Sequence, residues 1–368
     1  MKFRMMLSAL LAAGIVFVAG CGKIAKDQRR GIKFSDDKKT LVKYNAELTD
    51  TEYAIPSGVT TIGERAFAEC SYLTSVTIPS GVTAIGDGAF SGCIGVTSVT
   101  IPSGVTTIGK GVFSRCARLK SVTIPSGVTT IGEGAFEGCE SLTSVTIPSS
   151  VTIIGYAAFE GCKSLRSVTT PNSVTTIDRE AFAGCKNLES VTIPSNVTTN
   201  LYRIGLPMET LSFDRNVFHI DDSGAIINTK MRVLNGLPEN FSGEYTIPDG
   251  VTTISKEAFA GCKHLTSVTI PKGVTTIGNK AFYGCGLTSV TIPEGVTTIG
   301  EEAFVGCMNL TSVTIPEGVK EIGLEAFAGC ESLTSVTIPE GVTTIGRNAF
   351  FGCPCEEQVK RDYPHLFK

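Results

Sequence analysis

Cysteine is the residue type in this sequence that could take part in the widest range of chemistry. The 368-residue chain contains 13 cysteines. Many cysteines in an exported protein can form disulfides, bind zinc as thiolates, or pack as small apolar side chains. Eleven of them stand at one position of a repeated unit, 22 or 23 residues apart within each block: Cys70, Cys93, Cys116, Cys139, Cys162, Cys185, Cys262, Cys285, Cys307, Cys330 and Cys353.

The spacing of these cysteines favours packing. A Cys-x₂-Cys zinc site gathers its ligands within a few residues, whereas these cysteines are a whole unit apart and no histidine recurs with them. One cysteine per unit would form a column on the inward face of a stacked repeat, as buried free thiols. Strands about 4.8 Å apart lie at the short end of disulfide reach, so bridges between adjacent units remain an alternative. Cys353 and Cys355, which flank Pro354, are another possible pair.

No other constellation indicates catalysis. His219, His264 and His365 are scattered, with no nucleophile or carboxylate at a fixed spacing from them. The 40 glycines include no G-x-x-x-x-G-K-[ST] phosphate loop. The formal net charge is −3, and no basic cluster suits nucleic acid. We therefore expect no catalytic residues, no metal site, no cofactor and no nucleic-acid partner.

The cysteines belong to a unit that recurs over most of the chain. From proline to cysteine there are eleven complete units and a truncated twelfth that begins at Pro194. A short fixed period of this kind predicts a solenoid in which stacked units share a core, since one unit cannot fold alone. The prolines that mark the units are Pro56, Pro79, Pro102, Pro125, Pro148, Pro171, Pro194, Pro248, Pro271, Pro293, Pro316 and Pro339.

Each unit begins with a predicted strand. In residues 144–147 small or β-branched hydroxyl residues alternate with Val145 and Ile147, which predicts a short strand with these two side chains inward. Pro148 has no N–H and ends the pairing.

The rest of the unit turns the chain back. Val128 and Ile131 would send two more side chains inward, and Gly132 permits a backbone bend. Residues 134–139 are too short and glycine-rich for a stable helix, so a single helical or 3₁₀ turn is expected, with Phe136 and Cys139 on its inner face.

The pattern L-x-x-V-x-I-P-x-x-V-x-x-I-x-x-x-A-F-x-x-C, over roughly residues 53–353, resembles the BspA-like leucine-rich repeats, also called the Treponema pallidum type. The resemblance implies an α/β, β-rich repeat solenoid. This would be a curved right-handed leucine-rich-repeat superhelix with short parallel strands on the concave side and short helical or 3₁₀ turns elsewhere. Thr170 and Val96 depart from the pattern, and Asp178 and Ser255 replace the bend glycine. The last two suggest that the bend needs no glycine-only backbone conformation.

The N-terminal segment has the pattern that is typical of an export signal. Residues 1–20 contain Lys2 and Arg4, then an apolar run and the small residues before Cys21. Val-Ala-Gly-Cys resembles a bacterial lipobox, which implies lipidation of Cys21, while an ordinary secretory signal is the alternative. Gly22 is compatible with outer-membrane sorting. Lipid chains would anchor the protein durably, so we expect an exported protein, lipid-anchored to a bacterial membrane at the outer membrane or cell surface.

Two related segments precede the two repeat blocks. Residues 40–59 align without gaps to residues 232–251, and turn signals before each suggest β-hairpins that cover the open start of a block. The expected organisation is signal peptide 1–20, lipidated tether 21–31, N-terminal β-hairpin cap 32–54, repeat block 55–199, internal cap 200–247, repeat block 248–353 and C-terminal cap 354–368, which includes a short helix over 356–363.

The exposed strand positions are the best candidates for contact with a partner. They carry serine and threonine, which suit hydrogen bonding rather than acid–base work, although threonine also simply favours strands. An ice-matching threonine array is disfavoured, since a curved sheet would break the lattice match. The candidate binding face consists of Thr77, Thr100, Thr123, Thr146, Thr192, Thr269, Thr291, Thr314 and Thr337.

The residue after the proline varies between the two blocks. It is serine in most early units, such as Ser126. In the later units it is Asp249, Lys272, Glu294, Glu317 and Glu340, which makes this edge more acidic there. An acidic edge could orient a basic partner or serve solubility.

The expected function is binding without catalysis. Family resemblance implies adhesion to host extracellular-matrix or cell-surface proteins and glycans, or to other bacterial surfaces. The alternative is a structural, envelope-organising lipoprotein that faces the periplasm.

Overall fold

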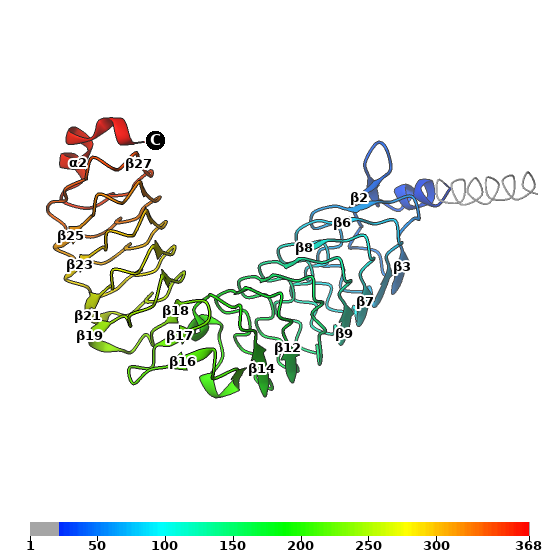
Figure 1. Cartoon of the computed structure of the whole chain (residues 1–368). Coiled ribbons are helices and arrows are strands. Elements are labelled where there is room, and N and C mark those ends of the chain that lie inside the picture. The colour runs from blue at the N-terminus through cyan, green and yellow to red at the C-terminus, as the bar shows by residue number, and fades with distance from the viewer. Residues whose placement is uncertain (1–21, 368) are drawn as a thin grey trace, which may run out of the picture. The chain divides into compact units, whose positions relative to one another are not determined.

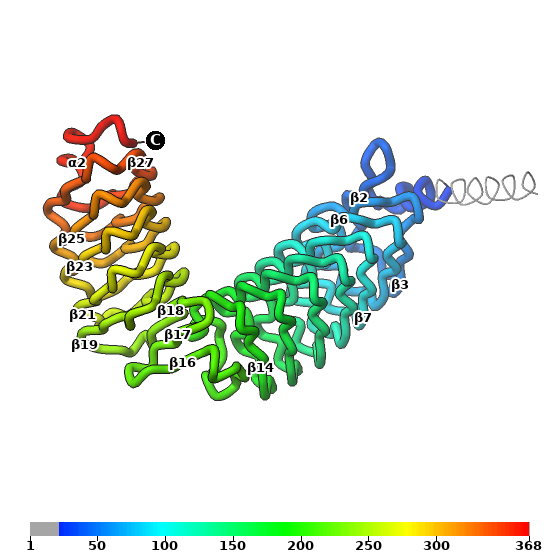
Figure 2. The backbone as a smooth tube through the Cα atoms, viewed as in Figure 1, coloured from blue at the N-terminus to red at the C-terminus, as the bar shows by residue number. Residues whose placement is uncertain are grey.

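The computed structural model describes residues 22–367, which divide into two compact units. The first runs to Pro194 and includes Arg203–Ser212. The second comprises Ser195–Tyr202 and the chain from Phe213 onward. Each unit is a stack of coils in which successive repeats follow one another in register (Figures 1 and 2). This confirms the predicted repeat solenoid. The predicted signal peptide and the predicted lipidation site Cys21 lie outside the described residues.

The predicted strand forms a parallel ladder in each unit. Identical residues pair from coil to coil, as in Ser98↔Ser121, Val99↔Val122 and Thr100↔Thr123. The inward residue of most strands is a buried valine, replaced by the buried Tyr53 and Tyr245 at the start of the two blocks, and its neighbours face outward because side chains alternate across a strand. In the coil of residues 144–147 the ladder narrows to one bridge, at Thr146. The strands are β3 (Glu52–Ala54), β5 (Ser75–Thr77), β7 (Ser98–Thr100), β9 (Ser121–Thr123), β12 (Ser167–Thr169), β14 (Ser190–Ile193) and β15 (Leu211–Phe213) in the first block, then β19 (Ser242–Thr246), β21 (His264–Thr269), β23 (Ser289–Thr291) and β25 (Ser312–Thr314).

A second parallel ladder, not predicted, runs through a two-residue strand of each coil that ends in isoleucine and is Thr-Ile in most coils. Its strands have two residues, too few for an alternation pattern in the sequence, yet they pair in register, as in Thr130↔Ile153 and Ile131↔Ile154. The buried isoleucine adds a second inward column to the core. The strands are β4 (Thr61–Ile62), β6 (Ala84–Ile85), β8 (Thr107–Ile108), β10 (Thr130–Ile131), β11 (Ile153–Ile154), β13 (Thr176–Ile177), β20 (Thr253–Ile254), β22 (Thr276–Ile277), β24 (Thr298–Ile299), β26 (Glu321–Ile322) and β27 (Thr344–Ile345).

The expected helical turn at residues 134–139 needs correction. Alternate N–H groups make turn bonds three residues back, such as Glu137 N to Gly134 O at 3.1 Å. The groups between them bond to the next coil, such as Phe136 N to Ala158 O at 2.8 Å. Gly134 (φ 56°) and Gly138 (φ 68°) break the helical run, since left-handed residues cannot continue a right-handed helix. The segment is thus a third set of bonds between coils.

Stacked phenylalanines fill the centre of each unit. Ring centroids of successive coils lie 5.0–5.6 Å apart from Phe67 to Phe182, with rings within 11° of parallel. A second column runs from Phe259 to Phe350 at 4.8–5.4 Å. Burial of one large aromatic per coil supplies the core that a single repeat lacks.

Close approach of neighbouring coils constrains most of the bend glycines, although Asp178 and Ser255 show that some coils accept a side chain at this position. None of these glycines has positive φ, as Asp178 and Ser255 at this position suggested. A Cβ on Gly132 would lie 2.9 Å from the carbonyl carbon of Gly109 and from the carbonyl oxygen of Ile108. Real Cβ atoms essentially never come this close to backbone, so the coils would have to separate.

We expect Gly132→Ala to destabilise the protein by about 1–3 kcal/mol, the usual cost of overpacking. Gly58→Ala is the matched control, because a Cβ there meets no atom within 4 Å. Urea denaturation of both variants measures the difference. Equal stability of the two variants would contradict the close-approach explanation.

The two segments related by sequence form the same arrangement at the start of each block. In the first, β1 (Lys33–Phe34) pairs antiparallel with β2 (Thr40–Lys43), and β2 pairs parallel with β4. In the second, β16 (Phe218–Ile220), β17 (Ile226–Asn228) and β18 (Val233–Gly236) are antiparallel, and β18 pairs parallel with β20. Each hairpin therefore starts the second ladder.

The segment expected to be a polar tether is packed onto the fold. Residues 22–29 are helical, and Ile24 and Asp27 are buried. The Tyr53 hydroxyl donates to Asp27 at 2.7 Å, which satisfies the buried carboxylate. The many charged residues of this segment led to the prediction of a solvated tether rather than an amphipathic helix. Within residues 22–367 no helix is long and apolar enough to cross a membrane.

The C-terminal segment packs on the last coil. The predicted helix is α2 (Glu356–Asp362), which buries Val359. Two 3₁₀ helices, η1 (Leu201–Arg203) and η2 (Met208–Thr210), lie in the interrupting segment, and η3 (Pro364–Leu366) follows α2. Phe367 bridges to Ile345 of β27 at the end of the second ladder.

Candidate functional site

The recurrent cysteines are buried, as predicted, and free. In nine coils the thiol donates to the phenylalanine carbonyl of the preceding coil at 2.9–3.3 Å, as Cys139 does to Phe113. Burial raises the pKa of Cys116 and Cys185 to about 12, which suppresses the reactive thiolate. Cys355 is also buried and free. These side chains are core components rather than reactive groups.

Native protein at pH 8 is therefore expected to leave these thiols unmodified by iodoacetamide, while protein in denaturant is labelled at all of them. Peptide mass mapping under non-reducing conditions measures both states. Extensive labelling of the native chain, or bridges between adjacent coils, would overturn the packing role.

The histidines do not converge. His219 lies in β16, His264 in β21 and His365 in η3, and all three are exposed. Among the described residues, no group of three or more His, Cys, Asp or Glu side chains could hold a metal ion.

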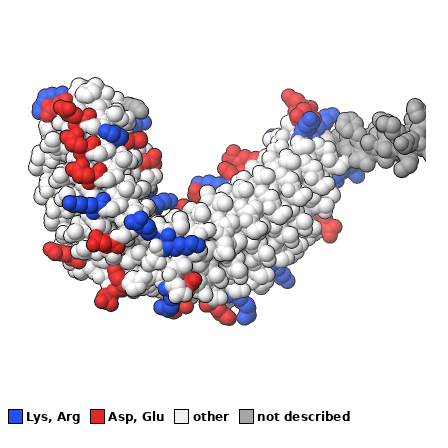
Figure 3. Space-filling view, viewed as in Figure 1, with Lys and Arg blue, Asp and Glu red and all other residues white. Residues whose placement is uncertain are grey.

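The structure places all nine candidate threonines at exposed positions of the first ladder or in the equivalent loop of a coil. Val99 and Val122, which precede two of them, are buried, so the threonines stand on the outer face. Within residues 22–367 no hydrogen bond involves their hydroxyls. Most of the first unit in the face shown in Figure 3 is free of charged side chains. We call these nine residues the threonine row.

The hydroxyls of a second column of threonines, in contrast, are hydrogen-bonded. The hydroxyl of Thr129 donates to the carbonyl of Thr106 at 3.4 Å, that of Thr152 to Thr129 at 3.3 Å, and that of Thr175 to Thr152 at 3.4 Å. These hydroxyls are hydrogen-bonded within the solenoid. The hydroxyls of the threonine row are not, so they are available to bind a partner.

The residues after the repeat prolines are exposed in the second block, as at Asp249, Glu294, Glu317 and Glu340. The equivalent Ser126 of the first block is also exposed. The two units therefore present edges of different charge, as the sequence indicated.

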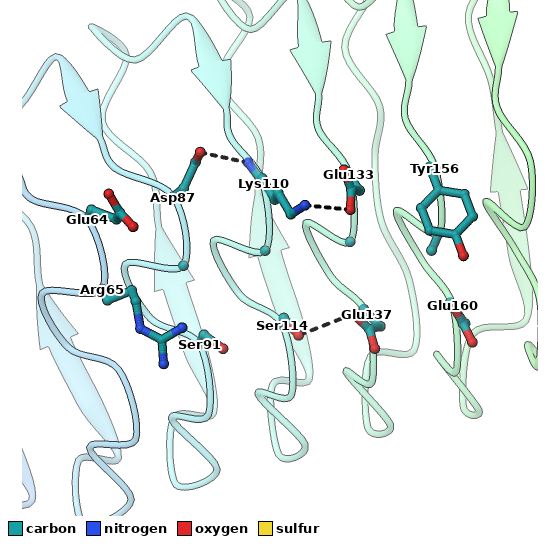
Figure 4. A pocket seen from close by; sticks show the side chains of 14 residues that line it. Glu64, Arg65, Asp87, Ser91, Lys110, Ser114, Glu133, Glu137, Tyr156 and Glu160 are labelled. Atoms are coloured by element: carbon teal, nitrogen blue, oxygen red, sulfur yellow. Dashed lines mark hydrogen bonds and ion pairs between the residues drawn. The ribbon is translucent and has the colours of Figure 1, made fainter. Parts of the chain in front are cut away.

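A groove that sequence reasoning missed crosses five coils of the first unit. Its volume is about 430 Å³. Figure 4 shows Glu64, Asp87, Lys110, Glu133 and Tyr156 along one side, and Arg65, Ser91, Ser114, Glu137 and Glu160 along the other. None of the threonine row lines it.

Glycine makes the floor of this groove. Gly88, Gly111 and Gly134 occupy a position with positive φ that carries a side chain in other coils, such as Arg65 and Lys280. Three successive coils without a Cβ there leave a trough. The sequence signal was Gly-x-Gly in three consecutive units, at residues 86–88, 109–111 and 132–134.

The groove is predominantly acidic. Five carboxylates line it against two cations. Lys110 pairs with Glu133 at 2.8 Å, and its backbone N–H donates to Asp87 at 2.9 Å. Burial, and then the charges of Glu137 and Glu180, raise the pKa of Glu160. Among the described residues no cation pairs with Glu64 or Glu160.

Comparison with known proteins identifies the repeats. A model of the BspA type leucine rich repeat region matches residues 44–165, 129–223 and 240–356. No curated protein matches the chain.

Solved structures of bacterial repeat proteins are similar. A leucine-rich repeat protein from Bacteroides ovatus is 30% identical over 92% of this chain and 97% of that chain, with a TM-score of 0.44. A leucine rich cell surface protein from Faecalibacterium prausnitzii is 32% identical over 88% and 90%, with a TM-score of 0.47. The leucine rich repeat protein of T. pallidum is 22% identical over 76% and 86%, with a TM-score of 0.32. Because the repeat model matches well over half of its residues, the chain belongs to the BspA-type leucine-rich repeat family.

Proposed function

We propose that this protein is a non-enzymatic bacterial surface lipoprotein whose solenoid binds proteins or glycans. Adhesion to host matrix or cells, or coaggregation with other bacteria, is the proposed role. The observation that carries the proposal is the threonine row, whose hydroxyls are exposed along both units and, within residues 22–367, have no hydrogen-bond partner.

Repetition gives such a surface its affinity. One hydroxyl contact contributes about 0.5–1.5 kcal/mol net, which is too little for stable binding. Several contacts to one extended partner act together, because each one formed raises the local concentration for the next.

A binding screen tests the proposal. Purified residues 22–368 are applied to arrays of extracellular-matrix proteins, glycans and whole bacterial cells. Saturable binding to at least one of them is expected, whereas uniformly negative arrays would refute adhesion.

Anchoring through Cys21 is the second part of the proposal and is supported by the lipobox pattern. Cys21→Ala is expected to abolish incorporation of labelled fatty acid and to release the protein from the membrane fraction. Retention of label in this variant would exclude lipidation at Cys21.

Exposure on the outside of the cell separates adhesion from the envelope-organising alternative. Protease applied to intact cells is expected to remove the solenoid. Survival of the full-length chain until the cells are broken would favour a periplasm-facing structural role.

A further inference from the structure

We propose that the groove of the first unit binds a lysine- or arginine-rich peptide segment of a partner protein in extended form. This surface is separate from the threonine row, and the proposal does not depend on adhesion. It rests on the floor, the two sides and the length of the groove.

The backbone N–H and carbonyl groups of the three floor glycines are already hydrogen-bonded within the solenoid. The N–H of Gly88 donates to Lys110 O, that of Gly111 to Glu133 O, and that of Gly134 to Tyr156 O, each at 2.8 Å. The carbonyls of these three glycines accept turn bonds from the N–H groups of Ser91, Ser114 and Glu137 at 2.9–3.1 Å. Gly88 and Gly111 are partly exposed, so the floor presents their Cα methylene groups, against which the aliphatic stems of lysine or arginine can pack.

The sides of the groove supply the matching charge. Glu137 and Glu160 are half-buried on one side, and the unpaired Glu64 stands on the other (Figure 4). Cationic heads above the floor would meet carboxylates on both sides. The Lys110–Glu133 pair at 2.8 Å already shows one lysine stem that crosses to the carboxylate of the next coil.

The length of the groove suits a short segment. Between the coils of Arg65 and Ala157 there are four coil spacings, which the stacked phenylalanines set at 5.0–5.5 Å each. An extended chain rises about 3.3–3.6 Å per residue, so about six residues span the groove. A single metal ion does not fit this chemistry, because no group of carboxylates in the described chain converges enough to hold one.

The test uses residues 22–368 with blocked hexalysine as probe, and hexaglutamate, a neutral Gly-Ser hexapeptide and chitohexaose as comparisons. Affinities are measured by calorimetry. Hexalysine is expected to bind, and the three comparison probes to bind much more weakly or not at all. Equal binding of the neutral peptide, or preferential binding of chitohexaose, would overturn the proposal.

Two kinds of variant place the binding in the groove. Glu137→Gln with Glu160→Gln is expected to weaken hexalysine binding roughly four- to tenfold, the effect of two partly exposed ion pairs. Glu317→Gln with Glu340→Gln changes the net charge equally on the second unit and should alter affinity less than about twofold.

The floor is tested separately. Gly111→Lys fills the floor with a side chain. Lys280 occupies the same position in another coil, with φ 57° against 59° for Gly111, so the fold should tolerate the change. This variant should lose hexalysine binding while its thermal midpoint falls only modestly, because an L-residue in the left-handed region costs about 1–2 kcal/mol. Equal weakening by the two glutamine pairs, or full binding by Gly111→Lys, would show diffuse attraction and refute a groove site.

Discussion

Replacement of Phe136 by alanine is expected to destabilise the protein by about 3–5 kcal/mol. Phe136 is fully buried, and its ring centroid lies 5.5 Å from that of Phe113 and 5.4 Å from that of Phe159. The cavity would therefore weaken two interfaces between coils, and the stability of a solenoid resides in such interfaces.

Phe351→Ala is the matched control within the same repeat pattern. Phe351 directly follows the buried Phe350 but is itself 61% exposed. Its replacement should change stability by no more than about 0.5 kcal/mol. Guanidinium denaturation of the two variants measures the contrast, and similar losses would contradict the assignment of the phenylalanine column as the core.

A rise in pH from 8 to about 10 is expected to lower the free energy of unfolding by roughly 4 kcal/mol through three thiols alone. Burial raises the pKa of Cys116, Cys185 and Cys307 to about 12 from the 9.0 of an exposed thiol. Below pH 9 both states are protonated, and these thiols contribute no pH dependence. Between pH 9 and 12 the unfolded chain loses protons that the folded chain retains. Stability therefore falls as pH rises, by about 1.4 kcal/mol per thiol per pH unit.

A triple variant isolates this effect. With alanine at positions 116, 185 and 307 the protein should be less stable at pH 7, owing to the cavities, but its stability should fall less steeply between pH 9 and 10. Denaturation midpoints across this range measure the slope. An unchanged slope would show that these thiols do not remain protonated in the fold.

The period of the sequence predicted the coil, its first strand and the buried cysteines, because one inward pattern repeated eleven times admits few other arrangements. Val122 and Cys139 illustrate this, since both occupy the inward positions that the pattern indicated. The second ladder was missed because Thr130 and Ile131 form a strand of only two residues. Its pairing depends on the neighbouring coils rather than on local sequence.

The need for glycine at the bend and the presence of the groove were also not predicted, because both depend on how neighbouring coils pack. The sequence suggests only a backbone bend at Gly132 and indicates no role for Gly111. Gly132 is required by the backbone of the preceding coil, and Gly111 leaves open the floor of a groove. Both effects arise between residues a whole repeat apart, so they became visible only once the coils were stacked.

Binding through the repeated threonine row is tested most directly by removal of its hydroxyls in steps. Variants of residues 22–368 carry valine at one, two or four of Thr77, Thr100, Thr123 and Thr146, and binding to immobilised extracellular matrix is measured against wild type. Valine keeps the shape and strand preference of threonine. Matched controls carry valine at Thr129, Thr152 and Thr175, whose hydroxyls are bonded within the solenoid. Affinity should fall with each step, by about tenfold or more for four replacements, while the controls bind as wild type. Undiminished binding by the fourfold variant, or equal losses in the controls, would contradict the proposed role of the threonine row.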